Sequence, residues 1–489
     1  MRGFLSNILS LMMGNIFTLI VNFVFSLVLV QRLSDNEFGL QAAIVAFSNI
    51  VMALASMGLF TVTSRELANR TPEQQHEIYN SVFSLQLVMA TVVCGAAGAV
   101  AALLGSFPGP QFIILLLGLF SLVLSYAPIA PTEALLIVRG QMWRMASLQS
   151  QYAFWSCLAG ILIVFQGGGI GPIYIALAIL SIVTILLYMR EAWRLVPGGP
   201  RLVFRPREWA YYLGEGFPGG LGSFFFITTR SIGTYLVYTF LSETHAGYLG
   251  VSFMLIQATT LIVWVPYAVS ILPVMTRLYS EARDQLQWLA SRSITWLMAV
   301  TLPVAIGTTL LAPEILRVLG ESKVAAAPTL RIFIWTIPLT VLVEFFFRML
   351  LVAGRQRVYL IATALGAILN IGLCLVLIPH YGLNGGVESA ALAALIGTGV
   401  IAVLCGWEVR SWLLPQARPS DLLRLSLALI GMALAVQTAN GLSVYMRIGI
   451  GALVYGVIAL VLGLFSLGDW HTARTLFATA TADSSSSPM

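Results

Sequence analysis

Long runs of apolar residues, separated by short polar connections, fill almost the whole chain. A helix that crosses a bilayer needs ~20 such residues in succession, and about fourteen segments reach this length. The first is near positions 8–30 and the seventh near positions 212–240. The pattern therefore predicts an all-α polytopic membrane protein with about fourteen transmembrane helices.

The composition agrees with this prediction. The chain is 58% hydrophobic and 9% charged, whereas a soluble domain carries about 25% charged residues. The net charge of +6 is spread over short loops, so membrane topology explains it and no nucleic-acid partner is expected. The stretch from Met1 to Leu9 shows no cleavable signal with a small-residue site, and the first apolar run is long enough to span.

The basic residues indicate how the spans are oriented. If the N-terminus is cytoplasmic, most of the 26 basic residues fall in connections on the cytoplasmic side, as membrane proteins prefer. Both termini are then cytoplasmic. The longest loop, from Arg190 to Arg207, divides the chain into six spans and eight.

The two sides of this loop carry a weak internal repeat. The run Leu33–Gly39 matches Leu241–Gly247, and Gly140 matches Gly354 at a similar offset. The repeat predicts two six-helix lobes related by pseudo-two-fold symmetry, plus two extra C-terminal helices. The predicted parts are an N-terminal lobe at 1–190, a cytoplasmic linker at 191–211, a C-terminal lobe at 212–410, the two extra helices at 411–467 and a disordered cytoplasmic tail at 468–489.

Polar residues follow one face of the first and the seventh predicted spans. Their steps of three, four and seven keep them on one side of each helix. Arg230 is in the middle of the seventh span, where a charge costs from ~3 to more than ~10 kcal/mol. We expect Arg230 to line a solvated cavity that binds an anion; the alternative is an ion pair with Glu344, Glu133 or Glu215. The predicted cavity residues on these faces are Asn15, Thr18, Asn22, Ser26, Ser223, Arg230 and Thr234, and interhelical hydrogen bonding is the alternative for the small ones.

Among the other charges within predicted spans, three are candidate functional residues. Arg331 starts the tenth span, where it either contacts substrate or extends to the membrane surface. Glu344, inside the same span, and Glu133, in the fourth, are candidates for an ion pair or for binding a coupling ion.

Signatures of enzymes are absent from the sequence. There is no GxxxxGK[ST] phosphate loop, and the four histidines and four cysteines show no metal-ligand spacing. No loop is long enough for a soluble catalytic domain. We therefore expect no catalytic residues, no cofactor and no metal.

The N-terminal region resembles a known family. The run Leu29–Gly39, the span end Ser56–Leu59, the loop start Ser64–Ala68 and the pair Gly247-Tyr248 resemble the polysaccharide transporter (Wzx-type) flippases. These belong to the superfamily of multidrug/oligosaccharidyl-lipid/polysaccharide exporters.

The resemblance implies a MATE/MurJ-like fold and a function. A protein of this kind flips a polyprenyl-diphosphate-linked oligosaccharide, of the exopolysaccharide or O-antigen type, from the cytoplasmic to the periplasmic leaflet of the bacterial inner membrane by alternating access. The coupling ion would be H⁺ or Na⁺, and the protein partners would be polysaccharide polymerase and export machinery. Relatives often have an acidic residue where this chain has Arg230, which favours direct anion contact here.

Three alternatives stay open at this point. A lipid II flippase shares the fold and the span count. A drug/cation antiporter shares the fold but would want an acidic cavity. A membrane glycan polymerase or ligase would need a large outer loop, which the sequence lacks.

Overall fold

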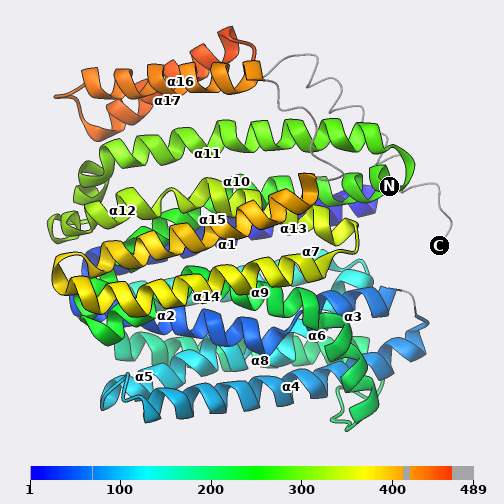
Figure 1. Ribbon diagram of the computed structural model, residues 1–489. Helices are drawn as coiled ribbons and strands as arrows, with labels where there is room; N and C mark the ends of the chain where they lie inside the picture. The colour runs from blue at the N-terminus through cyan, green and yellow to red at the C-terminus, as the bar shows by residue number, and fades with distance from the viewer. Residues whose placement is uncertain (1, 69, 411–418, 465–489) are drawn as a thin grey trace. The chain divides into compact units, whose positions relative to one another are not determined.

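The computed structural model describes residues 2–68, 70–410 and 419–464, and its regular elements are all helices (Figure 1). The first nine α-helices are α1 (Arg2–Arg32), α2 (Asp35–Ser56), α3 (Leu59–Ala68), α4 (Pro72–Leu103), α5 (Pro110–Leu119), α6 (Tyr126–Val138), α7 (Met142–Phe165), α8 (Ile170–Leu195) and α9 (Pro206–Phe240). The remaining ones are α10 (Glu243–Glu281), α11 (Arg283–Leu319), α12 (Ala327–Phe333), α13 (Thr336–Val352), α14 (Gln356–Tyr381), α15 (Gly386–Arg410), α16 (Pro419–Thr438) and α17 (Val444–Val461). A π-helix joins α5 to α6, and short 3₁₀ turns precede α12 and α15. The predicted tail at 468–489 lies outside the described residues.

Most of these helices are suited to cross a membrane. Twelve candidate spans are long and apolar enough among the described residues, and the pair Glu321–Phe333 and Thr336–Val352, bent by 44°, makes a thirteenth. The seventh predicted span is part of α9, which is not among them. Its many glycine, serine and threonine residues, together with Arg230, lower its hydropathy. The prediction of an all-helical membrane protein is confirmed, with twelve or thirteen candidate spans against the expected fourteen.

Residue contacts divide the chain into two compact units. The first contains residues 1–250 and 371–390, and the second contains residues 251–370 and 391–489. The predicted lobes follow the sequence repeat and separate α2 from α9, whereas in the structure these two helices pack along each other and fall into one unit. The lobe boundaries stay a prediction.

The run Leu33–Gly39 that opens the repeat contains a helix cap in the structure. Glu37 N donates to Ser34 Oγ at 3.3 Å, and Ser34 N donates to Glu37 Oε2 at 3.4 Å, which completes a capping box at the start of α2. The other carboxylate oxygen, Glu37 Oε1, accepts from Ile170 N at the start of α8 at 3.2 Å. At its far end α2 breaks at Met57 and Gly58, both with positive φ (40° and 71°), and the chain turns directly into α3.

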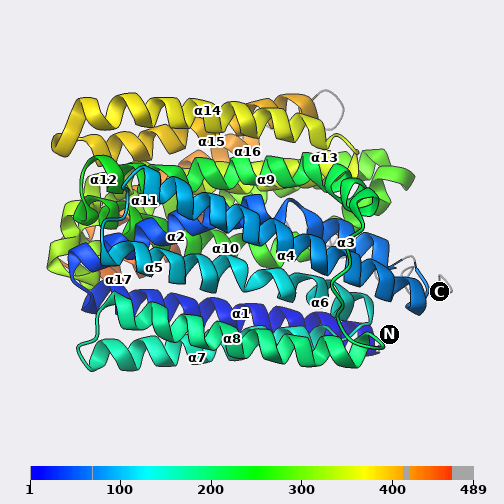
Figure 2. The ribbon, with the colours of Figure 1, turned by 90° about the horizontal axis from the view of Figure 1, so that it is seen from below.

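In the first unit, α1, α7 and α8 run side by side (Figure 2). The contact between α1 and α7 is close because Gly160 of α7 sits under the ring of Phe25, where a Cβ would clash. Tyr79 of α4 is fully buried and stacks on Phe83, with ring centroids 5.9 Å apart. These contacts gather α3, α4, α6 and α8 around one apolar core.

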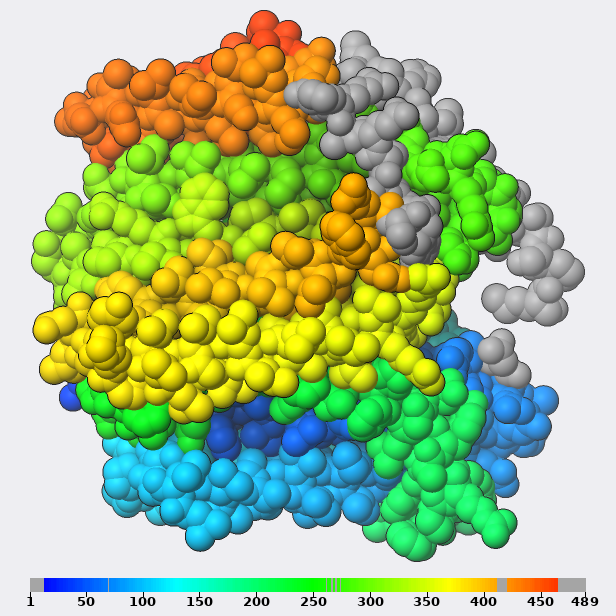
Figure 3. Space-filling view, viewed as in Figure 1, coloured from blue at the N-terminus to red at the C-terminus, as the bar shows by residue number. Residues whose placement is uncertain are grey.

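In the second unit, the hairpin of α16 and α17 lies along α11, at the top of Figures 1 and 3. Two ion pairs fasten it, the first buried and the second partly buried. Arg292 Nη1 is 2.7 Å from Asp421 Oδ2, and Arg447 Nη1 is 2.9 Å from Glu314 Oε1. Removing one partner of such a pair would leave a charge without compensation in an apolar setting.

Candidate functional site

Helix α9, which carries the predicted polar stripe, packs along α2. Gly216 and Gly220 of α9 approach the backbone of Met57 at the end of α2, with no room for a Cβ at either glycine. Seven, fourteen and eighteen residues after Gly216 come Ser223, Arg230 and Thr234, which an α-helix places within about 40° of the same direction. The predicted stripe therefore shares a side of α9 with the close α2 contact. Arg230 is half-buried there and Thr234 is buried.

Charged side chains meet at one end of the α2–α9 pair. We call it the Arg65 end. Arg65 Nη2 lies 2.7 Å from Glu215 Oε2 of α9, and Tyr211 Oη donates to Glu66 Oε1 at 3.0 Å. Glu215, one of the three proposed partners of Arg230, is thus engaged by Arg65 instead.

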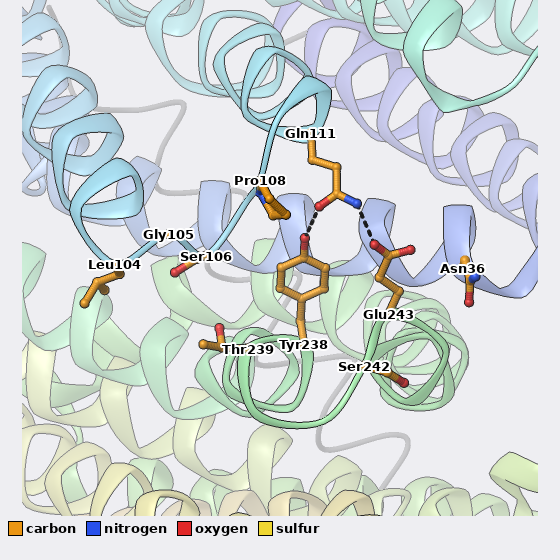
Figure 4. A pocket seen from close by; sticks show the side chains of 10 residues that line it. All are labelled: Asn36, Leu104, Gly105, Ser106, Pro108, Gln111, Tyr238, Thr239, Ser242 and Glu243. Atoms are coloured by element: carbon orange, nitrogen blue, oxygen red, sulfur yellow. Dashed lines mark hydrogen bonds between the residues drawn. The ribbon is translucent and has the colours of Figure 1, made fainter.

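The opposite end, which we call the Glu243 end, is held by hydrogen bonds. Thr244 Oγ1 donates to Asn36 Oδ1 at 2.5 Å. Gly39 of α2 packs directly on the carbonyl oxygen of Glu243, where a Cβ would clash. Gln111 joins this end from α5: its Nε2 donates to Glu243 Oε1 at 2.6 Å, and its Oε1 accepts from Tyr238 Oη at 2.7 Å (Figure 4).

A pocket of about 510 Å³ opens beside this network (Figure 4). Tyr238, which lines the pocket, belongs to an aromatic cluster: its ring stacks on that of Phe107 with centroids 4.8 Å apart, and nearby Phe47 of α2 packs on Tyr235 at 5.2 Å. The residues around the pocket are Asn36, Leu104, Gly105, Ser106, Pro108, Gln111, Tyr238, Thr239, Ser242 and Glu243. The sequence analysis did not identify this pocket.

The predicted stripe of α1 runs beside the α1–α7 contact. Gly14 packs on Ala146 of α7, and Thr18, one turn further on, has a buried hydroxyl without a hydrogen-bond partner among the described residues. Asn22 is exposed. Asn15 and Ser26 are half-buried.

Glu133 forms a second polar cluster in the first unit. Its side chain is almost fully buried, at 2% exposure. Its Oε1 accepts from Tyr188 Oη of α8 and Gln149 Nε2 of α7, both at 2.8 Å, and its Oε2 accepts from Tyr126 Oη at 3.4 Å. All three donors are neutral.

The position of Glu133 depends on irregular backbone. The π-helix Phe120–Leu124 leads into α6 just before Tyr126, and π-helical turns occur frequently at functional sites. Pro131 interrupts the hydrogen-bond pattern inside α6 itself. The sequence marked Glu133 but not Tyr126 or Tyr188, because an isolated tyrosine in an apolar span gives no sign of its partner.

The other two predicted residues belong to the second unit. Arg331 is exposed on α12. Glu344 is half-buried on α13, one turn before Arg348, whose guanidinium lies over the ring of Trp264 at 5.2 Å. The pairing of Glu344 with Arg230 stays a prediction.

The described residues contain no group of three or more His, Cys, Asp or Glu side chains that could hold a metal ion. The four cysteines are free thiols.

Comparisons with solved structures show the same architecture in known transporters. A lipid II flippase MurJ in an inward closed conformation superposes with a TM-score of 0.72, at 15% identity, over 92% of this chain and 98% of that one. An inward-facing multidrug resistance MATE family transporter of the MOP superfamily gives 0.60, at 16% identity, over 84% and 95%. An outward-facing MATE transporter gives 0.54, at 18% identity, over 87% and 96%. At these identities the likeness concerns the fold.

Sequence comparison identifies the family. A search of curated proteins finds no match. The profile of the family described as "Polysaccharide biosynthesis protein" matches residues 28–326, which is more than half of the chain and includes α2, α9 and the Glu133 cluster. The resemblance drawn from the sequence is confirmed: this multi-pass membrane protein, with the fold of the MOP-superfamily transporters, belongs to the polysaccharide biosynthesis protein family.

Proposed function

We propose that the protein is a flippase that moves a polyprenyl-diphosphate-linked oligosaccharide from the cytoplasmic to the periplasmic leaflet of a bacterial inner membrane. The family supplies the polysaccharide context, and the fold is that of transporters. A diphosphate headgroup cannot cross hydrocarbon unaided because desolvating its charges is too costly. The flippase supplies a polar route for it.

The observation that carries the proposal is the position of Arg230. By helical periodicity it shares a side of α9 with Gly216, and α2, which packs along α9, contacts that helix closely at both ends. Separation of α2 from α9 at one end would expose this face to one side of the membrane. Arginine binds phosphate oxygens with two parallel hydrogen bonds, so it suits the diphosphate. We assign the Arg65 end to the cytoplasmic side, in line with the distribution of basic residues, and both termini to the same side.

The remaining predicted residues take supporting roles in this proposal. Asn15, Thr18, Asn22, Ser26, Ser223 and Thr234 offer neutral hydrogen bonds to the headgroup, and Arg331 offers a second cationic contact. Polymerase and export proteins would take over the translocated unit.

Arg230→Ala in proteoliposomes tests the proposal. We expect headgroup translocation to fall about ten-fold or more, because a hydrogen bond to a charged group contributes ~1.5–3 kcal/mol. Arg317→Ala, at an exposed arginine of α11, is the matched control and should flip at the parent rate. Equal rates for Arg230→Ala and the parent would contradict the assignment of Arg230 to an anion site. A requirement for ATP would contradict the expectation, based on the absence of a phosphate loop, that translocation needs no nucleotide.

Glu133 is the proposed coupling residue. A buried carboxylate is costly in its charged form unless it is paired, and its three donors are neutral, so proton uptake and release there can follow changes in the packing of α6, α7 and α8. We expect the Glu133→Gln variant to translocate the headgroup at the parent rate when the pH is equal on both sides of the membrane. An imposed pH gradient, which should accelerate the parent, should not accelerate this variant. If a pH gradient accelerates translocation by the variant as much as by the parent, Glu133 is not the coupling residue. The Glu344→Gln variant then tests the other candidate carboxylate.

Lipid II is the second candidate substrate, because the MurJ structure superposes on nearly the whole chain. Proteoliposomes loaded with fluorescent lipid II and, separately, with a polyprenyl-diphosphate-linked oligosaccharide distinguish the two. Faster flipping of the oligosaccharide is expected.

A further inference from the structure

The pocket at the Glu243 end has the chemistry of a carbohydrate site. We propose that it binds an uncharged saccharide, and that it is a glycan subsite separate from the Arg230 face. Only the origin of that glycan, in the lipid-linked oligosaccharide, rests on the proposed function. The size agrees with a ligand site, since pockets for small molecules enclose ≈300–1,000 Å³ and this one encloses about 510 Å³.

The hydrogen-bonding groups around the pocket are both fixed and available. Gln111 is held between Tyr238 and Glu243, so the carboxylate is oriented before any ligand arrives. Glu243 Oε2 and the Asn36 amide nitrogen carry no hydrogen bond to described residues and are open to a ligand. Thr239 Oγ1 donates to the backbone of Tyr235 at 3.0 Å and can still accept. Sugar hydroxyls both donate and accept, and they match this mixture of an anionic acceptor, an amide donor and a hydroxyl.

The charge of the pocket excludes the other part of the lipid-linked substrate. Glu243 is the one ionisable acid among the residues that line it, and none of them is Lys, Arg or His. A diphosphate or an acidic sugar would be repelled by the carboxylate with no cation to compensate. An uncharged sugar loses nothing there, and it gains charge-assisted hydrogen bonds to Glu243.

The pocket also depends on two segments that are remote in sequence. Asn36 and the 104–111 stretch come from the first half of the chain, whereas Tyr238, Thr239, Ser242 and Glu243 come from the end of α9 and the start of α10 (Figure 4). The site is therefore complete only while the Glu243 end is closed. A saccharide bound there stabilises that closed arrangement by mass action.

Direct binding to the full-length protein in nanodiscs tests the proposal. The protein must be freed of maltoside detergent, whose headgroup is itself a saccharide. Saturation-transfer NMR is recorded with cellobiose, chitobiose, lactose and maltotriose as uncharged probes and with digalacturonate as the acidic probe. We expect transfer to at least one uncharged probe and none to digalacturonate.

Variants connect the signal to the pocket. Glu243→Gln keeps the shape and removes the charge, and Gln111→Leu removes the residue that orients Glu243; each should weaken binding about five- to ten-fold, the effect of losing one or two hydrogen bonds. Glu321→Gln, at an exposed carboxylate of the second unit, is the matched control and should bind like the parent. No transfer to any uncharged probe, or an affinity of both pocket variants equal to that of the parent, overturns the proposal.

A second arm distinguishes the source of the glycan and separates this proposal from the flippase assignment. The saccharide that binds is also presented as its polyprenyl-diphosphate conjugate, and translocation of the conjugate is measured in parallel. Saccharide binding without translocation would support the saccharide site and contradict the proposed flippase function. Translocation without saccharide binding would support the flippase function and contradict the saccharide site.

Discussion

The two ends of the α2–α9 pair close in different ways. At the Arg65 end the polar contact is an ion pair whose side chains are 54% and 43% exposed, and the tight fit comes from Gly216 and Gly220 against the end of α2. At the Glu243 end the polar contacts form a connected network beside an aromatic cluster. Exposed ion pairs contribute ~0–1 kcal/mol and are screened by salt, whereas breaking a hydrogen-bond network leaves desolvated groups unpaired. Close backbone packing is present at both ends, through Gly216 and Gly220 at the Arg65 end and Gly39 at the Glu243 end. The difference is that side-chain hydrogen bonds add substantially to the closure of the Glu243 end only.

The largest effect is expected from filling the glycine contact at the Arg65 end. Gly220→Leu places a side chain against the backbone of Met57, so α9 must move away from α2. In a cysteine-free background carrying Ser223→Cys, we expect thiol labelling to rise about ten-fold or more, since each 1.4 kcal/mol shifts a population ten-fold. Gly214→Leu, at a glycine with no atom near its Cβ direction, is the matched control. Unchanged labelling of Gly220→Leu would show that the stripe is not covered by α2.

An intermediate effect is expected from breaking the network at the other end. Gln111→Leu removes the two hydrogen bonds that Gln111 makes with the Tyr238 hydroxyl and the Glu243 carboxylate (Figure 4). We expect this to destabilise the closed Glu243 end by ~1–3 kcal/mol. Hydrogen–deuterium exchange should become faster at residues 239–247 and stay unchanged at residues 211–220. Faster exchange at both ends would mean that the two ends do not close independently.

The smallest effect is expected from the ion pair. Arg65→Ala should raise Ser223→Cys labelling less than about five-fold, which corresponds to ~1 kcal/mol or less, and the difference from the parent should shrink as salt is added. The swap Arg65→Glu with Glu215→Arg should restore the parent rate. A rise as large as that of Gly220→Leu would reverse the order of the two contributions.

The sequence predicted the local features of this region better than its contacts. The run Leu33–Gly39 was visible as a repeat, and its physical meaning is a capping box, which short spacing alone can reveal. The common face of Ser223, Arg230 and Thr234 also follows from helical periodicity.

The packing of α9 against α2 was not predictable. The approach of α9 to α2 depends on the contact of Gly216 and Gly220 with Met57, which is more than 150 positions away in the sequence. A glycine in a membrane helix does not indicate which segment will pack against it. The Glu133 cluster is similar, because its tyrosines come from separate turns and helices. Helix α9 is not among the candidate membrane spans for a different reason. Its polar residues, including Arg230, make it a candidate site and at the same time lower its hydropathy.

Glu37 has a mechanical consequence. The Glu37 carboxylate accepts hydrogen bonds from Ser34, at the start of α2, and from Ile170 N, at the start of α8, so it holds these two helix starts together. When α2 and α9 separate at the Glu243 end, we expect α2 and α8 to stay together as one rigid body and α9 to move relative to them. The connection between α8 and α9 contains Gly198 and Gly199, both with positive φ (77° and 75°), and this short glycine joint is where the swing would be absorbed.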